Sequence, residues 1–182
     1  GGGWHLSRLG GRLGQFLALT GARLDGAETH FAGLTTHYLP AEKLEEAKAR
    51  IIDNPSRIGG ILSELSISAP DARIEANCDR INKHFGSDRY EDILASLDAD
   101  DSDWAAKELA TLRSKSPQTC KVALRQLNES AKLDSFADNM AMEYRIASRV
   151  LTRPDFAEGV RAVIVDKTND PKWNPATPEG VS

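Results

Sequence analysis

Residues 155–167 read DFAEGVRAVIVDK, and a proline-rich segment with a central tryptophan, PKWNPA, follows at 171–176. Asp155 and Glu158 have the spacing of a capping box, in which the residue that opens a helix and the acidic residue three positions later exchange hydrogen bonds. By type the two carboxylates also suit an acid–base pair, but the apolar run behind them favours the cap. We therefore expect a helix that begins near Asp155 and ends at the basic Lys167.

Most of the remaining chain is also predicted to be helical, with seven or eight helices in all, because apolar residues recur at steps of three and four. Ser116 followed by Pro117 has the form of a helix start, since serine caps well and proline fits the first turn. Asp88 and Glu91 repeat the capping-box spacing. The longest predicted helix opens at 134–135. Its apolar stripe consists of Phe136, Met140, Tyr144, Ala147 and Leu151.

One stretch predicts a β-strand, LTTHYL at 34–39. Its β-branched threonines and its tyrosine favour extended backbone, and Pro40 closes it. The sequence therefore predicts a mainly α chain with one short strand.

The charge balance argues against nucleic acid and membrane as partners. The chain has 182 residues with 23 Lys and Arg against 27 Asp and Glu, which gives a net charge of −4. A mildly acidic chain without a basic block is not expected to bind nucleic acid or an anionic membrane surface. No apolar run is long enough to predict a membrane span.

Metal, redox and nucleotide motifs are also not expected. Cys78 and Cys120 lie far apart in the sequence and outside any Cys-x-x-Cys motif, so we expect two reduced thiols. The acidic run DADDSD at 98–103 lacks the glycine and the final glutamate of a calcium loop, and a solvated loop is favoured. The glycines at 1–3 lack the Lys-Ser/Thr of a phosphate-binding loop. We therefore expect no metal and no cofactor.

A family resemblance adds to these inferences. SPQTCKVALRQL (116–127), MEYRI (142–146) and DFAEGVRAVIVDKTNDPKWNP (155–175) resemble the longer C-terminal region of the 3-hydroxyisobutyryl-CoA hydrolase branch of the crotonase (enoyl-CoA hydratase/isomerase) superfamily. GGGWHLSRLGG (1–11) belongs to the same resemblance, and LALTGARLDGAETHFAGLTTHYLP (17–40) resembles the segment that nearly all crotonase-fold enzymes share. The resemblance spans nearly the whole chain, in the right order.

The resemblance implies that this chain is the C-terminal part of a crotonase-like α/β fold, a spiral of ββα units. Residues 1–53 would be the end of the crotonase-like core, and residues 54–182 the helical C-terminal region of the hydrolase branch. In the family pattern the catalytic glutamate and aspartate and both oxyanion-hole elements precede the glycine triplet. The resemblance therefore places no catalytic residue in this chain.

The resemblance assigns binding roles to a few residues. Those that it places beside the acyl group of the substrate are Gly1, Gly2, Gly3, Trp4 and Leu6. It places Arg161 and Lys167 near the CoA nucleotide, where a cation can pair with phosphate. Core packing is the alternative for Trp4. A surface salt bridge is the alternative for Arg161, and a charge at the helix end is the alternative for Lys167.

The function that the resemblance implies is hydrolysis of 3-hydroxyisobutyryl-CoA to 3-hydroxyisobutyrate and CoA in valine catabolism. Hydration or isomerisation of another acyl-CoA on the same fold is one alternative. A non-catalytic structural relative, such as a mitochondrial ribosome subunit, is another. The partners implied are the acyl-CoA substrate and the N-terminal half of the same enzyme, and a homo-oligomer is also compatible. The location would be the cytoplasm in a bacterium or the mitochondrial matrix in a eukaryote.

Overall fold

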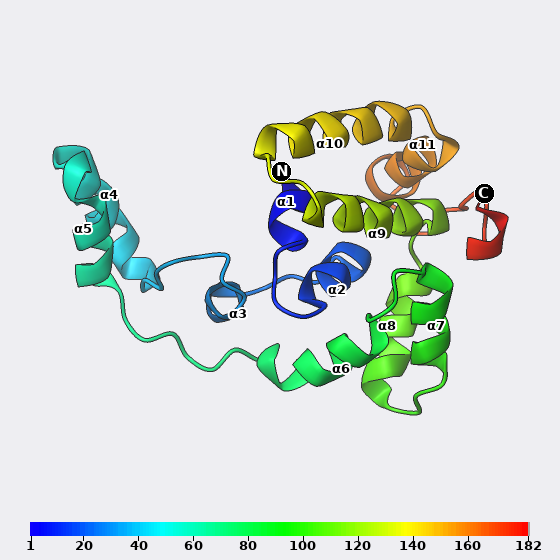
Figure 1. Cartoon of the computed structure of the whole chain (residues 1–182), viewed down its shortest axis with the longest axis horizontal. Helices are drawn as coiled ribbons and strands as arrows, with labels where there is room; N and C mark the ends of the chain where they lie inside the picture. Colours follow the sequence, from blue (N-terminus) through cyan, green and yellow to red (C-terminus); the bar gives the residue numbers. More distant parts are fainter. Residues whose placement is uncertain (182) are drawn as a thin grey trace. The chain divides into compact units, whose positions relative to one another are not determined.

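The computed structural model of the chain describes residues 1–181, and its regular elements are all helices (Figure 1). The chain divides into two compact units, one formed by Gly1–Ala22 with the residues from Asp79 onward, the other by Arg23–Cys78. Eleven α-helices are present among the described residues, more than the seven or eight predicted. Several of them have only one or two turns, which is too short to give a clear periodic signal. The division at residues 53 and 54 expected for the longer fold stays a prediction.

The unit formed by Arg23–Cys78 contains α3 (Gly26–Phe31), α4 (Leu44–Asp53) and α5 (Ile58–Leu65). The last two helices pack against each other around a small core. It consists of Ala47, Ile61 and Leu65, with the partly buried Leu39 and Ile51 against them.

A complete capping box opens α3. The Asp25 carboxylate accepts from the N–H of Glu28 at 2.9 Å, and the Glu28 carboxylate accepts from the N–H of Asp25 at 2.9 Å. The reciprocal bonds satisfy N–H groups that have no partner within the helix.

The other unit holds the remaining helices around a larger core. They are α1 (Gly2–Leu6), α2 (Leu13–Thr20), α6 (Cys78–His84, which starts at the boundary), α7 (Tyr90–Asp98), α8 (Asp103–Arg113), α9 (Pro117–Ala131), α10 (Phe136–Val150) and α11 (Pro154–Val160). A π-helical turn, Arg161–Val165, extends α11. Phe16 packs edge-on against the fully buried Phe85, with ring centroids 5.3 Å apart, and so ties α2 to the core of α6, α7 and α8.

Gly14 lets α1 and α2 approach closely. A Cβ atom at this position would lie 1.9 Å from the carbonyl oxygen of Leu6, far inside van der Waals contact. Only glycine therefore fits, and this contact fixes where α1 lies on α2. Gly21 ends α2 with a φ of +70°, a left-handed conformation that glycine adopts readily.

The predicted strand at 34–39 is wrong. Among the described residues no strand forms, and LTTHYL is irregular backbone. Its single backbone bond to a distant residue runs from the Ile67 N–H to the Tyr38 carbonyl, at 3.0 Å. β-Branched residues favour extended backbone, but a strand exists only when a neighbouring strand pairs with it. The described residues offer this segment no such neighbour.

Helix starts were predicted with mixed success. Ser116 and Ser135 do cap α9 and α10, since their hydroxyls accept from the N–H groups of Thr119 and Asp138. The capping box at Asp88 is wrong. The helix α7 begins at Tyr90 without a side-chain cap, and Asp88 instead pairs with Arg12 at 3.1 Å.

Neither described cysteine forms a disulfide, as predicted. None of the described helices has the length and apolar character needed to cross a membrane. Within residues 1–181 no group of three or more His, Cys, Asp or Glu side chains is placed to hold a metal ion.

Candidate functional site

The glycine triplet that the resemblance places beside the substrate opens α1. Gly2 and Gly3 lie in the first turn of the helix, and Gly3 is buried. The N–H of Gly3 donates to Glu143 Oε1 at 2.9 Å, across 140 residues of sequence. A Cβ atom at Gly3 would lie 2.9 Å from both Glu143 Oε1 and Gln126 Nε2. A side chain at Gly3 would therefore displace the ends of the Glu143 and Gln126 side chains.

Glu143 lies at the centre of a polar cluster between α1, α9 and α10. Oε1 also accepts from Asn139 Nδ2 at 3.0 Å and from Gln126 Nε2 at 3.3 Å, and the Gly1 nitrogen donates to Oε2. Burial by itself raises the pKa of the Glu143 carboxyl, but hydrogen bonds from the charged amino group of Gly1, from Asn139 and from Gly3 outweigh burial and lower the pKa. The cluster therefore holds the carboxylate against the first turn of α1.

Trp4 and Leu6 are both half-buried on α1. The Trp4 ring meets Phe136 edge-on with centroids 5.8 Å apart, and the Arg8 guanidinium lies 3.4 Å above the same ring. Trp4 therefore packs α1 against α10, as its alternative interpretation states, and a substrate-facing role stays a prediction. Leu6 contributes its backbone to the contact with Gly14.

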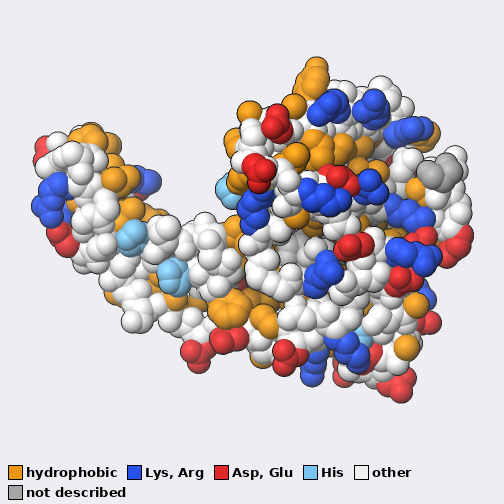
Figure 2. Space-filling view, in the orientation of Figure 1, with side chains coloured by type: hydrophobic (Ala, Val, Ile, Leu, Met, Phe, Trp, Pro, Cys, Tyr) orange, Lys and Arg blue, Asp and Glu red, His pale blue; other side chains and the backbone are white. Residues whose placement is uncertain are grey.

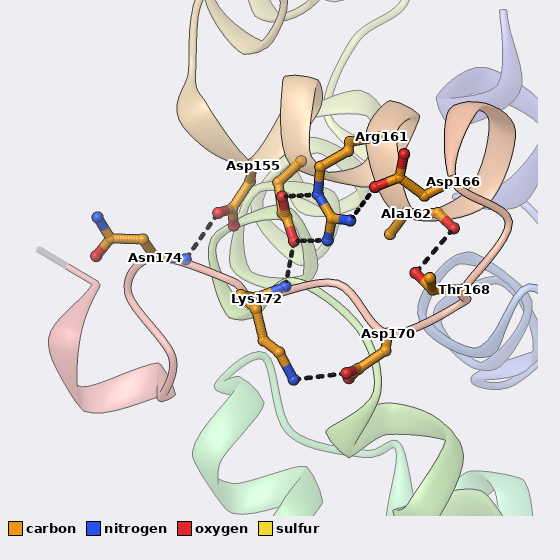
Figure 3. A network of polar contacts seen from close by, with 9 residues as sticks. Asp155, Arg161, Ala162, Asp166, Thr168, Asp170, Lys172 and Asn174 are labelled. Atoms are coloured by element: carbon orange, nitrogen blue, oxygen red, sulfur yellow. Dashed lines mark hydrogen bonds and ion pairs between the residues drawn. The ribbon is translucent and has the colours of Figure 1, made fainter.

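Arg161 and Lys167 lie elsewhere in the unit, in its C-terminal segment, where Arg161 belongs to a polar network (Figure 3). Arg161 binds the Glu158 carboxylate through Nε at 2.8 Å and Nη2 at 2.7 Å, and it also binds Asp166. These contacts raise the pKa of Arg161, first through Glu158. The charge of Arg161 is therefore already compensated within the protein.

Lys167 is exposed and has a φ of +55°, a conformation that side chains rarely adopt. Its ammonium group has no ion-pair partner among the residues that the structure describes. Of the two cations, only Lys167 is therefore available to an external anion.

The predicted capping box at Asp155 and Glu158 is wrong, because α11 begins one residue earlier, at Pro154, without a side-chain cap. Asp155 is buried and accepts from the Ser116 hydroxyl and from the N–H of Asn174, the latter at 2.8 Å. Glu158 accepts from the N–H of Lys172 as well as from Arg161. Both carboxylates therefore bind the tail of the chain instead of the helix end.

Further contacts bind the same tail. Trp173 donates from Nε1 to the carbonyl of Ser114 at 2.9 Å, and its ring lies against Gly159, where a Cβ would be 3.4 Å away. Lys121 donates to the carbonyl of Pro178 at 2.7 Å. The motif at 155–167 and the tryptophan-centred segment at 171–176 thus form one structural element.

A cavity of about 790 Å³ lies between α2, α9, α10, α11 and the tail. Most of its lining is apolar and includes Leu19, Val122, Ile146, Val150, Val160 and Trp173. Lys115, Arg149 and Arg153 are the cations that line it. In Figure 2 hydrophobic side chains gather where Figure 1 places α9 and α10, with Lys and Arg beside them. Such a cavity can accept an apolar group, and its cations can pair with an anion.

The helix α10 presents its predicted apolar stripe to solvent. Exposed fractions are 48% at Phe136, 41% at Met140, 74% at Tyr144 and 58% at Leu151. The buried face carries Asn139 instead, which is 0% exposed. Apolar side chains outward and a polar side chain inward are the reverse of the usual pattern for a surface helix.

A second polar group connects Ser96, His84 and Asp100. His84 Nδ1 lies 2.9 Å from Ser96 Oγ, and Nε2 lies 3.2 Å from Asp100 Oδ2. The residue types match a serine-hydrolase triad, but His84 is buried beside Trp104 and none of the three residues lines the cavity. We interpret the group as an internal support that links α6 and α7.

A protein-family model described as enoyl-CoA hydratase/isomerase matches residues 1–182. The chain belongs to the enoyl-CoA hydratase/isomerase family. Curated relatives within this family include the mitochondrial 3-hydroxyisobutyryl-CoA hydrolases of Xenopus laevis and Homo sapiens, both 38% identical to this chain. The matches cover 100% and 97% of this chain, but 49% and 48% of the relatives. The chain thus spans about half the length of the curated relatives it matches.

Solved structures in the enoyl-CoA hydratase/isomerase family agree with this placement. A carnitinyl-CoA dehydratase from Mycobacterium thermoresistibile superposes with a TM-score of 0.91 at 32% identity. An enoyl-CoA hydratase from Rhodobacter sphaeroides 2.4.1 superposes with a TM-score of 0.86 at 33% identity. Each match covers 100% of this chain and 52% of the solved chain.

The sequence patterns predicted the right family but not the residues that hold α1. The structure brings Gly1, Gly3 and Trp4 together against α10, whereas Arg161 and Lys167 lie in the C-terminal segment. Glu143 lies within the quoted MEYRI motif, yet it received no role. A signal was available, because Asn139 and Glu143 are polar residues four apart that lie side by side on the predicted helix, next to the apolar stripe.

Proposed function

We propose that this chain is the C-terminal part of a thioester hydrolase that converts 3-hydroxyisobutyryl-CoA to 3-hydroxyisobutyrate and CoA, in valine catabolism. The observation that carries the proposal is the 38% identity to enzymes named as this hydrolase, over 97–100% of the chain. The relatives' names also support a mitochondrial location if the source is a eukaryote. A bacterial protein would be cytoplasmic.

The catalytic groups of the proposed enzyme lie in an N-terminal half that precedes Gly1. Two features support such a half. The solved relatives are about twice as long as this chain, which matches 52% of each. The exposed stripe of α10 also needs a cover, and Gly1 lies directly on it, since a Cβ there would be 3.4 Å from Phe136. A chain that enters at Gly1 would therefore begin its path on this apolar surface.

A second candidate function is hydration or dehydration of an acyl-CoA. It is favoured by the names of the two solved relatives, a carnitinyl-CoA dehydratase and an enoyl-CoA hydratase. Both candidates use an acyl-CoA substrate, so they differ in the reaction and in the acyl group.

The complete protein, purified with its upstream half, distinguishes the two candidates. We expect it to release free CoA thiol from 3-hydroxyisobutyryl-CoA, and to hydrate crotonyl-CoA no faster than a buffer control. Hydration without thiol release would overturn the hydrolase and support the second candidate. Residues 1–182 alone should release no thiol, and release above the buffer control would contradict the placement of the catalytic groups upstream.

The isolated chain should also associate in solution, because its α10 stripe would be exposed to water. Light scattering after size exclusion measures the mass directly. A monodisperse monomer with a sharp cooperative melt would contradict a missing cover, whereas addition of the N-terminal half should restore a defined complex.

A further inference from the structure

We infer that Glu143 is a positioning residue of the enzyme: from α10 it fixes the backbone at Gly1–Gly3, and through it the segment that enters there. The inference rests on the proposed function, in which the half with the catalytic groups joins this chain at Gly1. The proposed role of the Glu143 carboxylate is indirect, because it determines where the turn at Gly1–Gly3 lies on α10.

The N-terminus of α1 is capped by a side chain from another helix. The first N–H groups of any helix have no partner within the helix, and a capping side chain normally binds one of them. In α1 the capping position is Gly1, which has no side chain to offer. Glu143 takes this role from another helix, because its Oε1 accepts from the Gly3 N–H. Its Oε2 binds the Gly1 nitrogen, which is a terminal ammonium in this chain and a peptide nitrogen in a longer protein.

The Glu143 carboxylate is itself held in place by two side-chain amides. Asn139 and Gln126 donate to the oxygen that also accepts from Gly3, at 3.0 and 3.3 Å. Asn139 is 0% exposed, and its Oδ1 accepts from the hydroxyl of the equally buried Ser130. Glu143 is therefore held from α9 and α10 at once, and it cannot shift without breaking bonds of buried groups.

Gly3 lies in close contact with the side chains of Glu143 and Gln126. A Cβ at Gly3 would come within 2.9 Å of both Glu143 Oε1 and Gln126 Nε2. A side chain here would therefore displace the carboxylate from the Gly3 N–H. The stretch GGG at the start of the chain and the glutamate of MEYRI are thus two parts of one contact.

A shift of the turn at Gly1–Gly3 is expected to lower the rate of the reaction. Positioning errors of about 1 Å at a reacting centre can lower the rate by about 10²-fold. Loss of Glu143 frees the turn at Gly1–Gly3 and therefore the segment attached to it. The effect should fall on kcat more than on KM, because substrate binding draws on many other contacts.

The test compares Glu143→Ala and Glu143→Gln in the complete protein, with 3-hydroxyisobutyryl-CoA as substrate. Glu143→Ala should lower kcat at least tenfold and change KM less than twofold. Glu143→Gln should recover part of the loss, because its amide oxygen can still accept from Gly3 while its NH₂ group faces the Gly1 nitrogen. Asp155→Ala is the matched control. It also removes a carboxylate that holds a remote backbone N–H, and it should leave kcat within twofold.

Hydrogen exchange at the Gly3 amide separates this inference from the proposed function. Exchange should accelerate in Glu143→Ala and not in Asp155→Ala. Wild-type kcat in both Glu143 variants, or a kcat loss no larger than in the control, would overturn the positioning role. If the wild-type protein does not hydrolyse the substrate, the proposed function fails, while unchanged Gly3 exchange in Glu143→Ala would overturn the anchor itself.

Discussion

Replacing Asp155 by alanine should detach the tail of the chain from α11 without affecting catalysis. The side chain is 6% exposed, and it connects the start of α9, through Ser116, with the backbone of Asn174. Alanine leaves both donors without this acceptor. The Ser116 hydroxyl still has a second contact, because it accepts from the N–H of Thr119.

The size of the effect follows from the two lost bonds. Hydrogen bonds to a charged acceptor contribute about 1.5–3 kcal/mol each, and a buried carboxylate that disappears no longer incurs its desolvation penalty. We therefore expect a net loss of about 2–4 kcal/mol in the free energy of unfolding of this region. If Asp155 were a simple helix cap, the loss would be about 0.5–2 kcal/mol. Asp155→Asn keeps an acceptor for the Asn174 N–H, so it should cost about 1 kcal/mol.

The assay is hydrogen exchange of the complete protein, read at residues 166–181 and at α7 as an internal reference. In Asp155→Ala the tail should exchange faster by the factor that the free-energy loss implies, while α7 stays protected and kcat stays near wild type. Unchanged exchange in the tail would refute the reasoning. So would a loss of kcat with an unchanged melting temperature, which would place the carboxylate in the reaction.

Three further predictions concern other contacts. Gly14→Ala should destabilise α1 and α2 by about 3 kcal/mol or more, because its Cβ would overlap the Leu6 carbonyl, whereas Gly10→Ala, with open space around it, should be near neutral in thermal melts. Hydrogen bonds from Arg161 and then Lys172 lower the pKa of Glu158 from 4.5 to about 2, so its contribution is complete above pH 4.5 and is lost as the pH falls towards 2. Hydrogen exchange in the tail should therefore accelerate as the pH falls from about 5 to about 2. A Glu158→Gln variant that kept the same pH dependence would contradict this cause. If the Lys167 ammonium meets the nucleotide phosphate, Lys167→Ala should raise KM for CoA thioesters without lowering kcat. Lys167→Gly, which also relieves the positive φ, should raise KM equally. Unchanged KM in both variants would remove the CoA role.

Local signals in the sequence predicted local structure well. Ser116-Pro117 and the serine at 135 carry their capping information in their immediate neighbours, and the structure confirms both helix starts. Gly21 likewise ends its helix because of its own backbone freedom. The strand at 34–39 failed because pairing depends on a partner that local propensity cannot supply.

Contacts between distant residues explain the failures at the candidate site. Asp155 has the spacing of a cap, but a backbone N–H 19 residues later is its actual partner. The role of Glu143 depends on Gly3, which is 140 residues away. Carboxylates suit many donors equally well, so their partners are decided by packing and not by neighbours in the sequence. The apolar stripe of α10 was predicted correctly as a stripe, yet no local rule shows which surface would cover it.

The pairing of α11 with the tail has a consequence for exchanging segments between relatives. Asp155 and Glu158 precede the backbone groups of Asn174 and Lys172 that they bind, and the chain between them is short. A chimera whose crossover falls between residues 158 and 172 would join the carboxylates of one parent to the tail of another. A crossover before Pro154 would transfer helix and tail together, although Ser116 and Ser114 would then come from the other parent. The inherited unit at this end of the protein is therefore the pair of motifs, and recombination that respects it should yield folded enzymes more often.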